Sequence, residues 1–191
     1  KNGGENGITL LGDTLKFVAG PQTDYFRSPD GSVVNNSAVI FTEVDNTKPF
    51  TFTAKVQPEF TETGTYSAGV IYAYENDTHC QKLCFEQDEY GDHRVVSVRT
   101  LGTSDDNNHQ AITAPYVYMR LSSDGTTLGS YFSEDGKIWR MARLYKNDFP
   151  EKLLIGISSQ SPKDNEHTCL FTEVSLTDKP VADFRKGNIA E

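Results

Sequence analysis

The feature that most constrains the fold is an alternation of apolar and polar residues in short runs. In the clearest run Phe50, Phe52, Ala54 and Val56 alternate with polar residues. A period of two is typical of a strand with one buried face. Further extended runs are predicted at 14–18, 38–41, 68–74, 81–87, 94–100, 117–121, 127–133, 138–144, 153–157 and 169–176. No window shows a sustained period of 3.6 residues, so the predicted fold is all-β.

Turn residues separate these runs. The Asp-Gly pairs at 124–125 and 135–136 are strong hairpin signals, because glycine adopts positive φ at little cost. About a dozen short strands at this spacing favour a sandwich or a barrel. No linker interrupts them. We therefore expect a single β-sandwich domain over 1–191, with its core at about 14–177 and loose termini.

Composition narrows the classes of partner. The 191 residues carry a formal net charge of −9 at pH 7, which disfavours nucleic acid and anionic membranes as partners. An acidic surface suits a neutral or cationic ligand, or simply maintains solubility. The chain begins at Lys1 with neither a methionine nor an apolar signal segment. A removed export signal and a trimmed chain would both give this start, so a secreted or periplasmic location is favoured and a cytoplasmic one stays open.

Two stretches resemble a known superfamily. The run YMRLSSDGTTLGSYFSEDGKIW (118–139) resembles a hairpin of concanavalin A-like lectin/glucanase domains, in which the residue at Trp139 packs under the sheet. The block AGVIYAYENDTHCQKLCFE (68–86), followed by VVSVRT and then Ser104-Asp105-Asp106, resembles a domain family of unknown function that includes the regulator-of-enolase protein. Related sandwiches are attached to some xylosidases and arabinofuranosidases. The resemblance implies a two-sheet antiparallel jelly roll whose concave face often binds sugars.

Alternation also predicts which side chains share a face. If Leu83 and Phe85 face the core, then Lys82, Cys84 and Glu86 face the other way. The same parity on the neighbouring strands predicts one polar ligand-binding face. Its candidate residues are Tyr72, Lys82, Glu86, Arg99, Tyr118 and Arg120, with Asp105 and Asp106 at its rim.

Such a face has the groups that a glycan groove needs. Aromatic rings stack on sugar C–H faces, and arginine and carboxylate groups form paired hydrogen bonds with hydroxyls. The sequence therefore predicts a non-catalytic domain that binds an oligo- or polysaccharide. One alternative is an ordinary solvated face with ion pairs such as Glu86–Arg99. Another is a protein-interaction or regulatory module with a protein partner, in keeping with the regulator-of-enolase resemblance.

A third alternative is a glycoside hydrolase centred on Glu86. Glucanases of the resembled superfamily carry Glu-x-Asp-x-x-Glu on one strand, and Glu86-Gln87-Asp88 supplies the first half of it. Gly91 stands where the second glutamate is needed, and one carboxylate does not make a retaining glycosidase. No catalytic residue is therefore predicted outside this alternative.

The cysteines and histidines do not predict a metal centre. Cys80 and Cys84 lie ~13 Å apart on one strand, too far for a disulfide within it. With His79, His167 and Cys169 they match none of the usual zinc spacings, and buried free cysteine is the commoner case. The oxygen-rich segment 104–108 lacks the EF-hand pattern, and a polar loop explains it. No metal and no cofactor are predicted.

Overall fold

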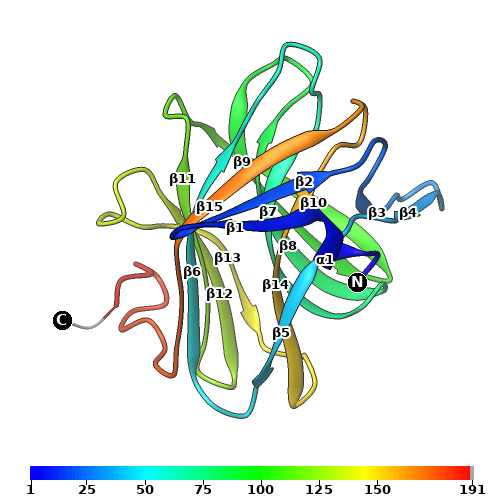
Figure 1. Ribbon diagram of the computed structural model, residues 1–191. Coiled ribbons are helices and arrows are strands. Elements are labelled where there is room, and N and C mark those ends of the chain that lie inside the picture. Colours follow the sequence, from blue (N-terminus) through cyan, green and yellow to red (C-terminus); the bar gives the residue numbers. More distant parts are fainter. Residues whose placement is uncertain (190–191) are drawn as a thin grey trace.

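The alternating runs form two antiparallel sheets in the computed structural model, which describes residues 1–189. The larger sheet has the strand order β1 (Ile8–Leu11), β2 (Thr14–Ala19), β15 (His167–Thr177), β6 (Phe50–Pro58), β11 (Val117–Ser123), β12 (Thr127–Ser133) and β13 (Arg140–Lys146). The smaller sheet has the order β10 (Thr103–Ala111), β9 (His93–Leu101), β8 (His79–Gln87), β7 (Ala68–Asn76), β14 (Lys152–Gln160) and β5 (Ile40–Asp45). The prediction of an all-β, two-sheet antiparallel sandwich is confirmed (Figure 1).

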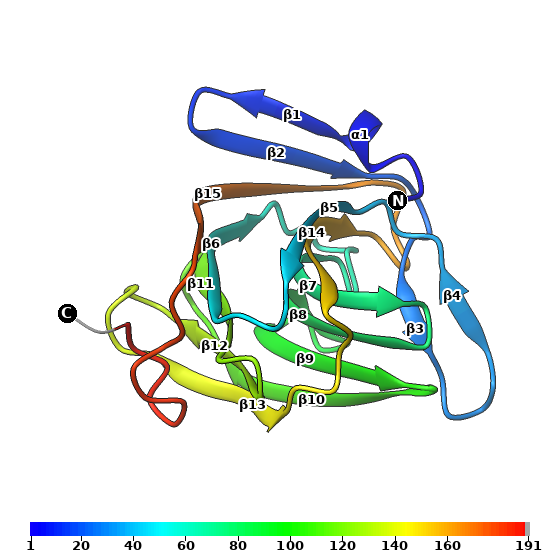
Figure 2. The ribbon, with the colours of Figure 1, turned by 90° about the horizontal axis from the view of Figure 1, so that it is seen from below.

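Two small elements lie outside these sheets. A hairpin is formed by β3 (Tyr25–Arg27) and β4 (Val33–Asn35), and a single helical turn, α1 (Gly4–Gly7), precedes β1. Figure 2 shows the hairpin standing at one side of the six-stranded sheet. Within residues 1–189, no helix is long and apolar enough to cross a membrane.

The two sheets share one apolar core. Phe52 and Val56 on β6 and Met119 on β11 are buried in it from the seven-stranded sheet. Leu83 and Phe85 on β8 enter the same core from the six-stranded sheet, as the alternation predicts. Burying each such side chain contributes about 1.5–3 kcal/mol. The core thereby fixes the direction of every alternate side chain on β8.

The opposite face of the six-stranded sheet, which we call the outer face, carries a second apolar cluster. Tyr72, Cys84, Val96 and Val98 belong to it. The β3–β4 hairpin covers part of this face, where Tyr25 packs edge-to-face on Tyr72 with 6.2 Å between ring centroids. The outer face is therefore partly walled by a segment that belongs to neither large sheet.

Four strands lie where none was predicted: β3 and β4 of the small hairpin, and β1 and β10 at the sheet edges. β10 includes the segment 104–108, which was expected to be a loop, and β1 lies in the expected loose lead-in. Both are edge strands with largely exposed side chains, so they lack the apolar alternation on which the prediction depended. The three cysteines, Cys80, Cys84 and Cys169, are buried and free.

Candidate functional site

A cavity of about 980 Å³ opens on the outer face. Strands β8, β9 and β10 contribute to its lining, together with the β3–β4 hairpin and residues 160–163. The polar groups that matter most for its chemistry are Asp24, Tyr66, Lys82, Glu86, Asp106 and Gln160. Three of these, Lys82, Glu86 and Asp106, are among the residues predicted from the sequence.

Lys82 is buried, and its ammonium group is hydrogen-bonded within the protein. Its Nζ donates to Asp24 Oδ1 at 2.6 Å and to Gln160 Oε1 at 3.1 Å. Burial lowers the pKa of Lys82, but Asp24, Cys84 and Glu86 together outweigh burial and raise that pKa above its ordinary value. The charge of Lys82 is therefore permanent and already compensated by the protein.

Glu86 lies on the same face of β8, two alternate positions further along. Within residues 1–189 its carboxyl group has no hydrogen-bond or ion-pair partner, and it lines the cavity. Removal from water raises its pKa to about 8, an effect that Lys82 partly offsets and that Asp24 and Asp106 reinforce. Near neutral pH this carboxyl can therefore donate as well as accept a hydrogen bond.

The remaining walls combine amides with aromatic rings. Tyr66 has a φ of 65°, a left-handed conformation that non-glycine residues rarely adopt. Its N–H donates to Gln87 O at 2.7 Å, and its carbonyl accepts from Gln160 Nε2 at 3.1 Å. Phe26 lines the cavity from the hairpin, and Asn108 does so from β10. The cavity thus offers aromatic faces beside carboxyl and amide groups.

Tyr72 lies on the predicted face but is fully covered. It is buried between Tyr25 and Phe41, both in edge-to-face contact with its ring. Its hydroxyl is buried without a hydrogen-bond partner among the described residues. Tyr72 therefore supports the site from below and does not line the cavity.

Arg99 and Asp105 lie on the other face, so their predicted grouping with Lys82 is wrong. The register pairs Lys82 with Val98 and Gln81 with Arg99, which turns Arg99 toward the seven-stranded sheet. There Arg99 Nη2 donates to Asp148 Oδ2 at 2.6 Å, so it does not form the ion pair with Glu86 that the alternative of a solvated face includes. The error arose because the prediction took Val96 and Val98 as core residues, whereas they belong to the apolar cluster on the outer face, which places Ser97 and Arg99 on the opposite face.

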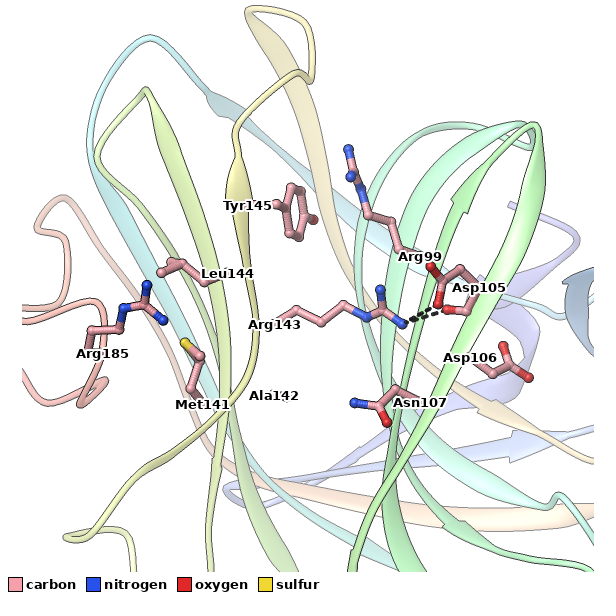
Figure 3. A pocket seen from close by; sticks show the side chains of 10 residues that line it. All are labelled: Arg99, Asp105, Asp106, Asn107, Met141, Ala142, Arg143, Leu144, Tyr145 and Arg185. Atoms are coloured by element: carbon pink, nitrogen blue, oxygen red, sulfur yellow. Dashed lines mark hydrogen bonds and ion pairs between the residues drawn. The ribbon is translucent and has the colours of Figure 1, made fainter.

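Asp105 and Arg99 instead line a second cavity of about 570 Å³. Figure 3 shows Arg143 reaching from β13 to Asp105 on β10, with its Nη2 at 3.0 Å from Asp105 Oδ1, while Asp106 is turned away from Arg143. Asp106 borders both cavities, because β10 separates them. Adjacent residues of one strand therefore serve two different surfaces.

Tyr118 and Arg120 belong to β11 of the seven-stranded sheet, so they are not on the outer face either. Arg120 Nη1 donates to Gly187 O at 2.6 Å, and its guanidinium lies 3.6 Å from the ring centroid of Trp139. Trp139 is half-buried over Arg120 and not in the core, contrary to the expectation. Tyr118 donates to Glu173 Oε1 at 3.1 Å. Sheet membership depends on long-range pairing, which alternation does not encode.

Sequence reasoning missed Asp24, Tyr66, Asn108 and Gln160. Asp24 precedes a three-residue strand and meets Lys82 across 58 positions of sequence. Tyr66 lies before β7, and Gln160 ends β14. Only Asn108 carried a signal, because it alternates with Asp106 within the polar segment.

Fold and cavity together define a β-sandwich with a polar site on the outer face of one sheet. The chain belongs to the family described as protein of unknown function (DUF1349), which matches residues 6–179. That match does not bear on the regulator-of-enolase resemblance, which stays a prediction. No curated protein matches the chain in sequence.

Solved structures share the fold. A functionally unknown protein from Saccharomyces cerevisiae has a TM-score of 0.80 and 22% identity, with 90% of this chain and 91% of that chain covered. A xylan β-1,4-xylosidase from Bacillus halodurans has a TM-score of 0.61 and 13% identity, with 83% and 32% covered. An alginate lyase from Pseudomonas aeruginosa has a TM-score of 0.57 and 11% identity, with 90% and 86% covered. At such identities the likeness is one of fold.

Proposed function

We propose that the outer-face cavity binds carbohydrate without catalysing its conversion. The observation that carries this proposal is the combination, in one cavity of about 980 Å³, of unpaired carboxyl groups, amides and aromatic rings. A cavity of this volume suits a bound oligosaccharide segment. The xylosidase and the lyase that share the fold act on carbohydrates by their names, which supports the same class of ligand.

The residues of the cavity have complementary roles in this proposal. Glu86 donates to or accepts from a sugar hydroxyl, because its carboxyl is protonated over part of the neutral range. Asp106 and Asn108 supply further acceptors and a donor from β10. Tyr66 and Phe26 offer ring faces to sugar C–H groups. The Lys82–Asp24 pair keeps the floor of the cavity in place.

A thermal-shift screen of neutral, amino and acidic oligosaccharides tests the proposal. We expect at least one to raise the melting temperature of the wild-type chain, and Glu86→Gln and Asp106→Asn to reduce that shift. Asp105→Asn is the matched control, because Asp105 neighbours Asp106 on β10 but faces the second cavity. A ligand whose shift responds to Asp105→Asn and not to the cavity variants would contradict the proposed site, and a blank across the screen would contradict the function.

Glycoside hydrolysis is the second candidate, and the raised pKa of Glu86 favours it, because a general acid must hold a proton near neutral pH. The nearest carboxylate along the chain argues against it. Asp88 accepts from the backbone N–H groups of Tyr90 and Asp92 and from Arg94 Nε, so it organises the turn after β8. Release of reducing sugar from a bound oligosaccharide, lost in Glu86→Gln, would establish hydrolysis. Binding without release supports the non-catalytic function.

A further inference from the structure

The charges of the outer-face cavity are unbalanced. Its acidic residues are Asp24, Glu86, Glu89 and Asp106, and its basic residues are Lys82 and Lys163. Lys82 is compensated by Asp24 at 2.6 Å. Lys163 and Glu89 are both exposed at the margin. Glu86 and Asp106 therefore remain as carboxyl groups that face the cavity without a basic partner among the described residues.

The second cavity has the opposite character. Arg99, Arg143 and Arg185 line it, and no arginine of residues 1–189 lines the outer-face cavity. Strand β10 separates the two, with Asp105 turned toward Arg143 and Asp106 toward the acidic side. The arginines that could bind an acidic sugar are thus held away from the carbohydrate site proposed above.

We infer that the outer-face cavity selects carbohydrates that carry free amino groups over neutral ones, and excludes those that carry carboxylates. This inference rests on the proposed function and names its class of ligand. A protonated sugar amine donates charge-assisted hydrogen bonds to Glu86 and Asp106, which are stronger than those of a neutral hydroxyl. A positive charge beside Glu86 also favours its ionised form, so the bound amine lowers the pKa of about 8 and pairs with a carboxylate. A sugar carboxylate in the same place raises the pKa of both carboxyl groups further, and Lys82, already paired with Asp24, does not compensate its charge.

Isothermal titration at about pH 6, where sugar amines are largely protonated, separates the three classes. The ligands are a glucosamine oligomer, an N-acetylglucosamine oligomer and a uronic acid oligomer of equal length. We expect the glucosamine oligomer to bind at least about tenfold more tightly than the N-acetylated one, a factor that corresponds to about 1.4 kcal/mol. The uronic acid oligomer should give no measurable heat of binding at the outer face. Added salt should reduce the preference, because it screens charges at the cavity mouth.

Substitutions test whether the carboxyl groups of Glu86 and Asp106 cause the preference for the glucosamine oligomer. The double variant Glu86→Gln/Asp106→Asn should bring the two affinities within about twofold of each other, and Asp105→Asn should preserve the wild-type ratio. Equal binding of the glucosamine and N-acetylglucosamine oligomers by the wild-type chain would overturn the inference while leaving the proposed function in place. Uronic acid binding that Glu86→Gln alters would also overturn it. If no carbohydrate binds at all, the proposed function fails and the inference with it.

Discussion

Lys82 and Glu86 lie on the same face of one strand, but only Lys82 is paired with a group of opposite charge. Lys82 has a carboxylate at 2.6 Å and an amide oxygen at 3.1 Å. Glu86 has no such partner within the described residues, and burial raises its pKa to about 8. Groups with strongly shifted pKa values in a cavity are candidates for function. Glu86 is therefore the strongest candidate for a ligand-binding residue in the outer-face cavity.

The raised pKa of Glu86 predicts a stability effect. The folded chain binds a proton at Glu86 up to about pH 8, whereas the unfolded chain releases it near 4.5. Stability from this group is therefore complete below about pH 4.5 and declines as the pH rises to about 8. Glu86→Gln removes this loss of stability with pH. The free energy of unfolding of Glu86→Gln minus that of the wild type should therefore rise by about 1.4 kcal/mol per pH unit in this window. Urea unfolding between pH 5 and pH 8 measures the gain, and a constant difference would contradict the assignment.

His167 predicts the opposite slope. It is buried, with its Nδ1 at 2.8 Å from Ser159 Oγ, and burial lowers its pKa from 6.5 to about 4. Between these values the unfolded chain binds more protons, so stability is lost as the pH falls from about 6.5 to about 4. In a Glu86→Gln background the free energy of unfolding should fall by about 1.4 kcal/mol per pH unit across this window. Adding His167→Gln should flatten the dependence, and an unchanged slope would show that another group is responsible.

Alternation predicted side-chain direction correctly where the apolar residues of a strand face the shared core. It placed Lys82 and Glu86 correctly, because Leu83 and Phe85 between them are core residues. It failed for Arg99, because Val96 and Val98 alternate with Ser97 and Arg99 but pack in the second apolar cluster, on the outer face. The pairing of Lys82 with Asp24 lay beyond any local pattern, since it joins a buried strand to a loop far away in sequence.

At the scale of elements, the β3–β4 hairpin is what turns a flat sheet face into a cavity. It is attached to the six-stranded sheet by the Lys82–Asp24 ion pair and by the backbone N–H of Arg27, which donates to Ser104 Oγ at 3.0 Å. Arg27 Nε also donates to Gly102 O at 2.8 Å. The hairpin is too short to be stable alone, so these contacts determine its position.

Removing one partner of the buried ion pair should be costly. Asp24→Asn leaves the ammonium group of Lys82 buried without its counter-charge, and we expect a loss of about 3–5 kcal/mol in the free energy of unfolding. Asp24→Asn/Lys82→Met should recover most of that loss. Asp105→Asn disrupts an exposed pair with Arg143 and should cost no more than about 1 kcal/mol. Equal effects of Asp24→Asn and Asp105→Asn in urea unfolding would contradict this view of the pair.

The packing between β7 and the seven-stranded sheet gives another prediction. A Cβ at Gly69 would clash with Cys169 Sγ and Val56 Cγ1, both buried in the core. Gly69→Ala should therefore lower the free energy of unfolding by about 1–3 kcal/mol. Gly20→Ala is the matched control, because a Cβ there meets no atom within 4 Å. A Gly69→Ala chain as stable as the Gly20→Ala chain would mean that the sheets are less tightly packed than described.

Element prediction succeeded where strands are half-buried and failed at the edges. β6 and β8 were recognised because each buries alternate apolar residues. β10 was taken for a polar loop, because an edge strand needs only backbone hydrogen bonds to its single neighbour, β9. The position of β11 in the opposite sheet from β8 separated Arg120 from the site, and no local signal encodes that choice.

At the scale of the whole molecule, the sandwich holds together through one shared core, and the cavity proposed for binding lies on the outer face of the six-stranded sheet. Solved structures with 11% to 22% identity keep this architecture, so the core pattern tolerates wide change in sequence. The fold could be predicted because alternation and turns recur throughout the chain. The site could be predicted only in part, because its walls come from segments that meet only after folding.

Carbohydrate binding at the outer-face cavity is the proposal on which the selectivity for amino sugars rests. The most direct test is a titration of the ¹⁵N-labelled chain with the glucosamine oligomer, followed by amide chemical shifts. We expect shifts concentrated at residues 82–86 and 106–108 and in the β3–β4 hairpin, lost in Glu86→Gln/Asp106→Asn and kept in Asp105→Asn. Shifts confined to the outer side of the seven-stranded sheet around Tyr118 and Arg120, or no shifts at saturating oligomer, would contradict it.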